Sequence, residues 1–416
     1  MRGRHGHSVA RHLLFVMFVS SAASADDQVA LPSPLGVADV VRIARARRPE
    51  VVAAQARARA AAERPEIVSA LDDPTVLPSI DHLPFALGGA NVSLTVEQRF
   101  PLSHVRAHRR DAAEADARRE VAEIDRVGLD VELDAATAFW MLAETRAVAK
   151  ILDEQRALAD QVTKAATARY SASTGPQADV LRARLEVDRL DGERQAFVAE
   201  IRAAEAMLDT SLARSPDATI PELDATVTDA EPPRAAAVMT AAVDRRPELR
   251  ADRAGIARSE ADLEVMHSMY VPMASVRTGP NYMMTDGAGW MLMVGITIPL
   301  WRGKLRAGVA EATATVAMAN AELDATQRTI VGEAVVGRER VEAARARYLA
   351  LRDDILPRAT EVVTSTLAAY SADQLPLVSA IDAARALWST QRELIEAQAE
   401  LGLAWARLQR TTGDAR

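Results

Sequence analysis

The sequence contains no cysteine, and this absence removes several classes of protein at once. A lipid anchor at a signal-peptide junction, a disulfide framework and a thiolate zinc site all need cysteine. Aromatic residues are also scarce, at 4% of the 416 residues, whereas charged residues make up 26%. Such a composition is typical of long solvated helices that pack through small residues.

A net positive charge and long hydrophobic runs are lacking too. The formal net charge is −8, so the chain has no general basic character for binding nucleic acid. After the first 25 residues, the most apolar stretch is residues 290–301, which is short and contains Thr297 and Pro299. A helix that crosses the inner membrane is therefore not expected.

The known catalytic motifs are missing as well. We find no glycine-rich phosphate loop, nucleophile elbow, HExxH pair or paired-carboxylate cleft motif in the sequence. We therefore expect no enzymatic activity and no cofactor.

Residues 1–25 have the pattern of a cleaved signal peptide. Three arginines precede a short apolar segment at 13–19, and Ala23 and Ala25 supply the small residues of a cleavage site. We expect cleavage after Ala25 and a mature protein that is periplasmic, secreted or in the outer membrane.

The rest of the chain reads as a tandem duplication. The tripeptide Arg-Pro-Glu at 48–50 recurs at 246–248, and Pro101-Leu102 recurs as Pro299-Leu300, both 198 residues later. The dipeptide Tyr-Ser at 170–171 recurs at 370–371. A nearly constant offset predicts two repeats, at 26–213 and 235–411, joined by a proline-bearing linker at 214–234.

Both repeats have the same predicted order of helix, β-hairpin, long helix and return helix. In the first repeat these elements are expected at 36–70, 74–101, 104–170 and 177–213. In the second they are expected at 235–267, 269–300, 304–370 and 377–411. Apolar and small residues recur every seven positions in the long helices, which predicts coiled-coil packing with close helix approach. In the first repeat those positions form two lines, Val121, Gly128, Ala135, Leu142 and Ala149, and Ile124, Val131, Ala138, Thr145 and Leu152. In the second repeat they are Val316, Leu323, Ile330, Gly337, Ala344 and Leu351.

The last predicted strand resembles one that crosses a membrane. From Trp290 to Ile298 apolar side chains alternate onto one face, and Trp290 and Trp301 bracket the segment like interfacial anchors. Four strands cannot close a barrel, and lipid tolerates no open sheet edge. Three copies would supply twelve strands. A soluble helical protein with small β tips is the alternative.

Several signatures resemble those of the TolC-type outer-membrane efflux channels. They are VEQRFPL at 96–102, VGITIPL at 294–300 followed by Lys304 and Arg306, and the helix turn from Tyr170 through Gly175 to Asp179. The resemblance covers nearly all of the mature chain and is strongest to the ducts of heavy-metal efflux pumps.

This resemblance implies a mainly α fold with a small membrane β-barrel. A homotrimer would form a 12-stranded barrel in the outer-membrane lipid, continued by a periplasmic α-helical tunnel. It also implies two partners, a periplasmic adaptor and an inner-membrane pump, with the RND type favoured. The alternative is that the chain is itself the periplasmic adaptor, but adaptors carry one helical hairpin, and the whole-chain duplication argues against that role.

The resemblance further implies a closable aperture at the helix–helix turns. Position by position, Asp179 matches a gate-lock aspartate, Tyr370 the lock tyrosine and Asp382 a ring aspartate. Leu375 and Ser379 stand where the family has a lock arginine and a second ring aspartate, so a looser latch with fewer carboxylates is expected. Asp179 is equally explained as an acidic residue in the first turn of a helix, and Asp382 as a solvated helix residue.

Metal binding is a weaker hypothesis. Seven of the thirteen methionines lie between residues 266 and 293, and Met283 and Met284 are the candidates for a soft ion. Met291 and Met293 alternate with Trp290 and Leu292 and are explained equally well by packing. His104 and His108 have the spacing of helical ligands, but no third ligand accompanies them.

Overall fold

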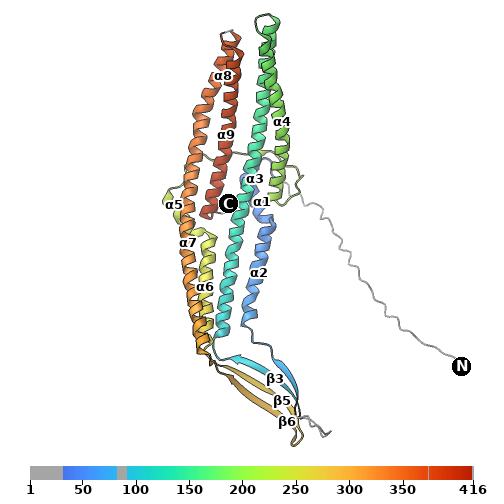
Figure 1. Ribbon diagram of the computed structural model, residues 1–416, viewed down its shortest axis with the longest axis vertical. Helices are drawn as coiled ribbons and strands as arrows, with labels where there is room; N and C mark the ends of the chain where they lie inside the picture. The colour runs from blue at the N-terminus through green and yellow to red at the C-terminus, as the bar shows by residue number, and fades with distance from the viewer. Residues whose placement is uncertain (1–30, 82–90, 373, 415–416) are drawn as a thin grey trace, which may run out of the picture. The chain divides into compact units, whose positions relative to one another are not determined.

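The computed structural model describes residues 31–81, 91–372 and 374–414, of which 32–414 lie in one compact unit (Figure 1). The predicted signal peptide at 1–25 and the predicted turn at Gly88–Gly89 lie outside the described residues. None of the described helices has both the length and the apolarity needed to cross a membrane.

The helix that opens each repeat is broken in two, where the sequence predicts one. The first repeat has α1 (Val37–Arg47) and α2 (Pro49–Ser69), and the second has α5 (Ala235–Arg245) and α6 (Pro247–Ser268). Arg48 and Arg246 lie at the breaks with ψ of 129° and 125°. A residue before proline is pushed out of the helical region, so the duplicated Arg-Pro-Glu motif is itself the break.

The hairpin helices of the first repeat are continuous. α3 runs Val105–Ser171 and α4 runs Gln177–Ser211, and the two pack against each other. Between α3 and α9 (Leu377–Thr412), glycine makes room for a large side chain. At Gly402, for example, a Cβ atom would lie 2.1 Å from the indole of the buried Trp140.

The long helix of the second repeat is interrupted, contrary to the prediction of one helix at 304–370. It consists of α7 (Arg302–Leu349), a π-helical segment η1 (Ala350–Ile355) and α8 (Leu356–Ser371), and α9 (Leu377–Thr412) returns beside α8. Pro357 has no N–H to donate to the preceding turn, so the hydrogen-bond ladder shifts just before it.

Much of the predicted heptad seam is buried. Ile330, Gly337, Ala344 and Leu351 are buried at seven-residue spacing in the second repeat, and Ile330 and Ala344 join one apolar cluster with residues of α5, α6 and α9. Val121 was predicted to lie on the seam but is exposed. The helices around it pack through small side chains such as Ala112, Ala115 and Ala122 instead.

The two β-hairpins form one antiparallel sheet. Its strands are β2 (Thr75–Asp81), β3 (Asn91–Pro101), β5 (Met273–Met283) and β6 (Gly287–Thr297), in the order β2-β3-β5-β6. β3 pairs with β5, so the sheet joins the two repeats. A second, small sheet pairs β1 (Leu35–Gly36) in parallel with β4 (Leu223–Asp224) of the linker.

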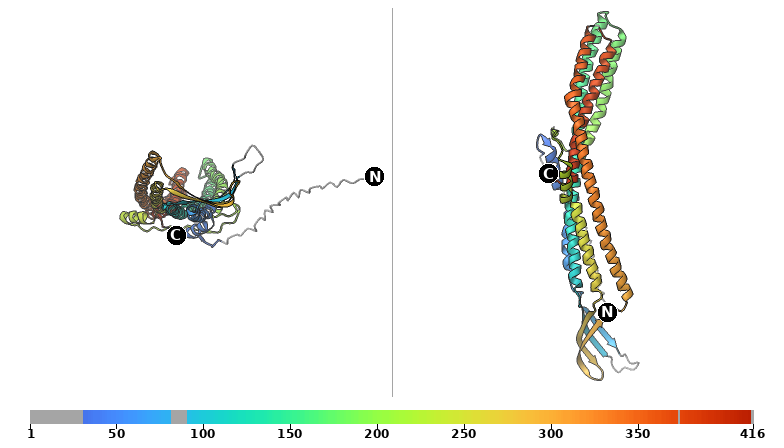
Figure 2. Two further views of the ribbon diagram at one scale, coloured as in Figure 1. Left: turned by 90° about the horizontal axis from the view of Figure 1, so that it is seen from below. Right: turned by 90° about the vertical axis from the view of Figure 1, so that its left-hand side faces the viewer.

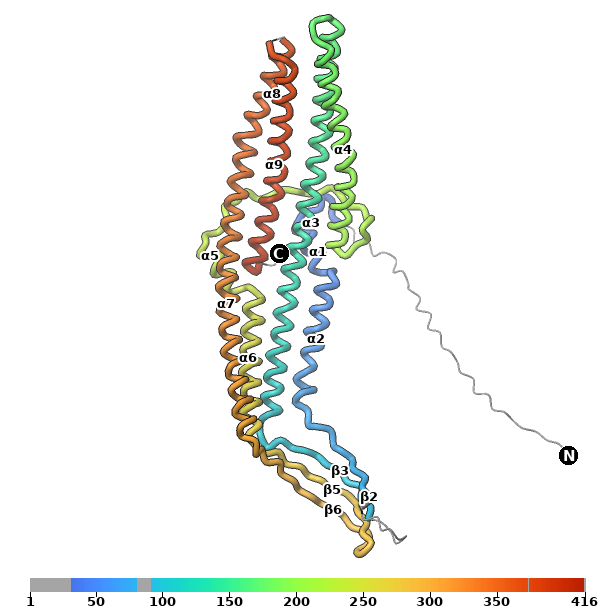
Figure 3. Tube along the Cα trace, in the orientation of Figure 1, coloured from blue at the N-terminus to red at the C-terminus, as the bar shows by residue number. Residues whose placement is uncertain are grey.

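Within this unit, α2, α3, α6 and α7 run side by side next to the sheet (Figures 2 and 3). β3 leads directly into α3 and β6 into α7, so the α3–α4 and α8–α9 turns lie at the far ends of the long helices from the sheet. This unit therefore has a β end and a helical tip.

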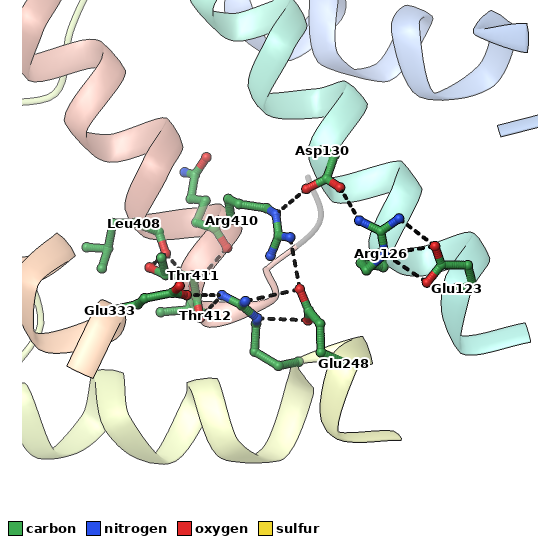
Figure 4. A network of polar contacts seen from close by, with 11 residues as sticks. Glu123, Arg126, Asp130, Glu248, Glu333, Leu408, Arg410, Thr411 and Thr412 are labelled. Atoms are coloured by element: carbon green, nitrogen blue, oxygen red, sulfur yellow. Dashed lines mark hydrogen bonds and ion pairs between the residues drawn. The ribbon is translucent and has the colours of Figure 1, made fainter. Parts of the chain in front are cut away.

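A network of ion pairs joins α3, α6 and α9 partway along the helices (Figure 4). Arg410 donates to Asp130 at 2.6 Å and to Glu248 at 2.9 Å, and Asp130 also accepts from Arg126 at 2.7 Å. Glu248 in turn accepts from Arg246 at the break before α6. The second copy of the Arg-Pro-Glu motif thus links the two repeats.

Candidate functional site

One face of the four-stranded sheet is apolar and exposed. The register places Val76 beside Val96, Thr278 beside Leu292 and Val276 beside Val294, which puts the apolar residues of all four strands on one face. The exposed large apolar residues of this face are Val76, Ile80, Val92, Leu94, Val96, Phe100, Tyr282, Trp290, Leu292, Val294 and Ile296. Such a large apolar surface needs a cover in water or a lipid environment.

The two predicted interface tryptophans are strongly exposed. Trp290 is 71% exposed on β6, and its indole N–H donates to Thr278 Oγ1 at 2.7 Å. Trp301, at the start of α7, is 79% exposed. They lie near opposite ends of the apolar stripe on β6, which is the arrangement that interfacial anchors require.

The opposite face of the sheet carries the polar side chains. Ser79 and Ser93 are hydrogen-bonded at 3.0 Å, and Arg277 donates to Glu97 at 2.9 Å. The register also places Met291 opposite Gly279 and Met293 opposite Arg277 on this face. The sheet is therefore amphipathic across its whole width.

Both edges of this sheet are open within the described residues. β2 pairs only with β3, and β6 pairs only with β5. An unpaired edge exposes a row of backbone N–H and C=O groups, which are normally satisfied by another strand. Among the described residues, no strand pairs with the outer edge of β2 or of β6.

At the helical tip, Tyr370 is held by an arginine that sequence reasoning missed. Tyr370 is 3% exposed and packs with Ala166, Val180 and Leu377. The Arg169 guanidinium lies 4.9 Å from the centre of the Tyr370 ring, and its Nη1 donates to the Tyr370 carbonyl at 3.0 Å. Arg169 lies on α3 and Tyr370 on α8, so this contact ties the two helical hairpins together.

A second link joins the hairpins further from the turns. Arg385 of α9 forms a two-pronged ion pair with the buried Glu186 of α4, with Nε 3.2 Å from Oε2. The Glu186 carboxylate and its hydrogen bonds raise the pKa of the Arg385 guanidinium above its ordinary value. The two helical hairpins are thus joined at two positions, near the turns by Arg169 and further from them by Arg385.

The other predicted gate residues lie close to the same turns. Asp179 is half-buried in the first turn of α4, and its side chain has no ion pair with a described residue. Asp382 is exposed on α9. Leu375 is exposed beside the α8–α9 turn and Ser379 is half-buried. Within one chain, Tyr370 is therefore clasped by Arg169 and not by Asp179.

One sequence signal could have pointed to Arg169. Tyr170 and Tyr370 are equivalent in the two repeats, but the residue before Tyr170 is arginine and the residue before Tyr370 is Ala369. This difference between the copies indicates that Arg169 of the first repeat has a role that its counterpart in the second repeat lacks, namely the contact with Tyr370.

The proposed metal ligands are not brought together. Met283 ends β5 and Met284 lies in the turn that follows, whereas His104 and His108 lie at the start of α3, beside the other end of the sheet. The 11 residues of β5 separate the two pairs by roughly 35 Å. No group of three or more His, Asp or Glu residues in the described part of the chain could hold a metal ion.

A fully buried carboxylate lies near the end of α4, where sequence analysis predicted nothing. Asp209 Oδ1 is 3.4 Å from Nη1 of the nearly buried Arg214, and neither carboxylate oxygen accepts a hydrogen bond from a described residue. Burial raises the pKa of Asp209 to about 6, with Glu205 and Asp217 adding to the rise and Arg214 opposing it.

Comparison with solved structures places this fold among outer-membrane channels. The chain is similar to CusC, with a TM-score of 0.78 and 13% identity over 91% of this chain and 92% of CusC. It is also similar to the outer membrane protein VceC of Vibrio cholerae, with a TM-score of 0.75 and 15% identity over 91% and 96% of the two chains. It is similar as well to the open state of the MtrE outer membrane channel of Neisseria gonorrhoeae, with a TM-score of 0.71 and 16% identity over 91% of this chain and 88% of MtrE.

A comparison with family models gives a match within the second repeat. Residues 238–414 match the family model of outer membrane efflux proteins. No curated protein matches the sequence. The fold class predicted from the sequence, mainly α with a small sheet of the efflux-channel type, is confirmed.

Proposed function

We propose that this chain is the outer-membrane exit duct of an efflux system and acts as a homotrimer. The observation that carries the proposal is the four-stranded sheet, which has one exposed apolar face and two unpaired edges. A sheet of this kind is stable in lipid only when it closes on itself, because lipid cannot satisfy the edge groups. Three copies supply twelve strands, with β6 of each chain pairing with β2 of the next.

Closure directs the two faces of the sheet to different surroundings. The apolar face with Trp290 and Trp301 lies against lipid, and the polar face with Glu97 and Arg277 lines a water-filled passage. The long helices continue the passage into the periplasm. No active site is needed for this task, because the duct provides a passive path.

The aperture of the duct lies at the helical tip. Asp382 from three chains lines the opening, and Asp179 and Tyr370 take part in closing it. Arg169 takes over the holding of Tyr370, which explains how a tip with Leu375 and Ser379 can still be latched.

The partners in this proposal are a periplasmic adaptor that docks at the tip and an inner-membrane pump, of the RND type. Heavy-metal ions are one class of cargo in the proposal, on the strength of the sequence resemblance alone. The alternative that the chain is the adaptor has no support from the comparisons, since its fold is that of the channels.

Mass measurement and conductance together test the proposal. Protein extracted in detergent is expected to contain three chains by light scattering and to form conducting pores in planar bilayers. A stable detergent-free monomer that forms no pores would contradict both the trimer and the duct.

A further inference from the structure

A cavity of about 330 Å³ lies where the helices meet the sheet. Its walls come from the end of α2, the start of α3 and the end of α6, together with the adjacent ends of β3, β5 and β6. The volume lies within the range of pockets that hold small organic molecules.

The strand register decides which face of the sheet this cavity adjoins. Met273, Thr297 and Pro101 all line the cavity, and they are paired neighbours across the three strands. Counting along each strand by twos, they fall on the polar face with Glu97, Arg277 and Met293. In the closed trimer the cavity therefore opens to the passage and not to lipid.

The wall of the cavity is unexpectedly apolar for a polar face. Leu71, Met269, Val271 and Met273 line it, and each is between 37% and 40% exposed. Elsewhere this face carries serines, an ion pair and glycines, with Met291 and Met293 as its apolar side chains on β6. A local apolar patch beside a water-filled passage is a surface that an apolar group of a solute would cover.

Two arginines border the same cavity. Arg106 donates from Nε to the Ser69 carbonyl at 2.6 Å, and the side chain of Arg109 has no ion pair or hydrogen bond with any residue that the structure describes. Both are exposed. Asp72 is the one carboxylate on the wall, so the cavity has an excess of positive charge. Guanidinium groups bind carboxylate, sulfonate and phosphate groups strongly because the donors form a fixed fork.

We propose that this cavity binds anionic amphiphiles during their passage, with the acidic head at Arg109 and Arg106 and the apolar part on Val271 and Met273. The inference rests on the proposed function, because the cavity faces a passage only in the closed trimer. It adds a substrate class, namely small organic acids with an apolar tail, to a duct that otherwise selects little.

Single-channel currents in planar bilayers test the site, with decanoate below its micellar concentration as the probe. Decanoate is expected to cause brief, concentration-dependent closures. Decyltrimethylammonium, which has the opposite charge, and inorganic sulfate, which has no tail, are expected to cause none at equal concentration.

Two variants address the two halves of the site, and a third is the matched control. Arg109→Gln and Val271→Ser are each expected to weaken decanoate block about tenfold, which corresponds to the loss of one good contact. Arg118→Gln changes another exposed arginine of α3, outside the cavity, and should leave the block unchanged.

Equal block of the wild type and Arg109→Gln, or equal block by decanoate and decyltrimethylammonium, would overturn the inference. So would block by sulfate as strong as that by decanoate, because a bare anion site would then suffice. If the protein forms conducting pores that decanoate does not block, the proposed binding at the cavity is wrong and the proposed duct function still stands. If the protein forms no pores, the proposed duct function itself is wrong.

Discussion

The buried carboxylate of Asp209, near the end of α4, makes the stability of the fold depend on pH. This carboxylate is fully buried, its oppositely charged partner among the described residues is Arg214, and its pKa is raised to about 6 by burial. The folded protein therefore takes up a proton at a higher pH than the unfolded chain does. Between the ordinary pKa of 3.8 and about 6, this group makes folding more favourable as the pH falls.

Replacing Asp209 by asparagine should remove this dependence. We expect the Asp209→Asn protein to melt about 2–4 °C higher than the wild type at pH 7.5, because the wild type then carries an unfavourable buried charge. The difference should fall to about half by pH 5, and it should vanish only below the ordinary pKa of 3.8, where the carboxyl is protonated in the folded and the unfolded chain alike. Circular dichroism melts at one scan rate measure both values, and Asp324→Asn, at an exposed position of α7, is the control. A gap that widens on acidification would contradict the assignment.

Unlike Asp209, Asp382 is exposed, and its proposed role at the aperture requires no ion pair. Three such carboxylates around a narrow aperture would concentrate negative potential there. We expect Asp382→Asn to reduce cation preference in bilayer recordings and to weaken block by divalent cations added on the tip side about tenfold. Asp188→Asn, at an exposed position of α4, should change neither property. If Asp382→Asn also changes neither, other residues line the aperture.

Pro49, Pro247 and Pro357 lie at interruptions of the helices and explain two errors of the sequence prediction, whereas Pro65 lies inside α2 without ending it. The Arg-Pro-Glu motif is informative as a repeat marker, but the same proline ends the preceding helix by extending Arg48 and Arg246. Pro357 likewise produces the π segment in the second repeat. Periodicity predicts that a segment is helical, but it carries no information on a local shift in the hydrogen-bond ladder.

The link between α3 and α8 predicts a measurable effect on the aperture. Replacing Arg169 by glutamine removes its positive charge over the Tyr370 ring and the charged donor to the Tyr370 carbonyl. A loss of about 1 kcal/mol from the closed state would raise the ratio of open to closed channels about fivefold. Mean single-channel current reports this ratio directly.

The matched control for this experiment is Arg182→Gln, at an exposed arginine of α4 that has no ion pair with a described residue. It should behave like the wild type. If Arg169→Gln and Arg182→Gln give the same current as the wild type, the contact at Tyr370 does not hold the aperture closed.

For the molecule as a whole, the sequence predicts much of the architecture but not its junctions. The alternation on β6 and the seven-residue spacing in the long helices are local patterns, so they can be recognised directly in the sequence. The pairing of β3 with β5 depends on two segments about 180 residues apart meeting in space. The cavity beside Arg109 and the contact of Arg169 with Tyr370 arise only from such meetings.

The orientation of the molecule gives the most direct test of the exit-duct account. Because the sequence has no native cysteine, a single introduced cysteine can be labelled without background. Asp286→Cys lies in the turn between β5 and β6, and Thr174→Cys lies in the α3–α4 turn at the opposite end. A membrane-impermeant maleimide should label Asp286→Cys in intact cells, and Thr174→Cys only after the outer membrane is ruptured. Labelling of Thr174→Cys in intact cells, with Asp286→Cys protected until rupture, would contradict the account.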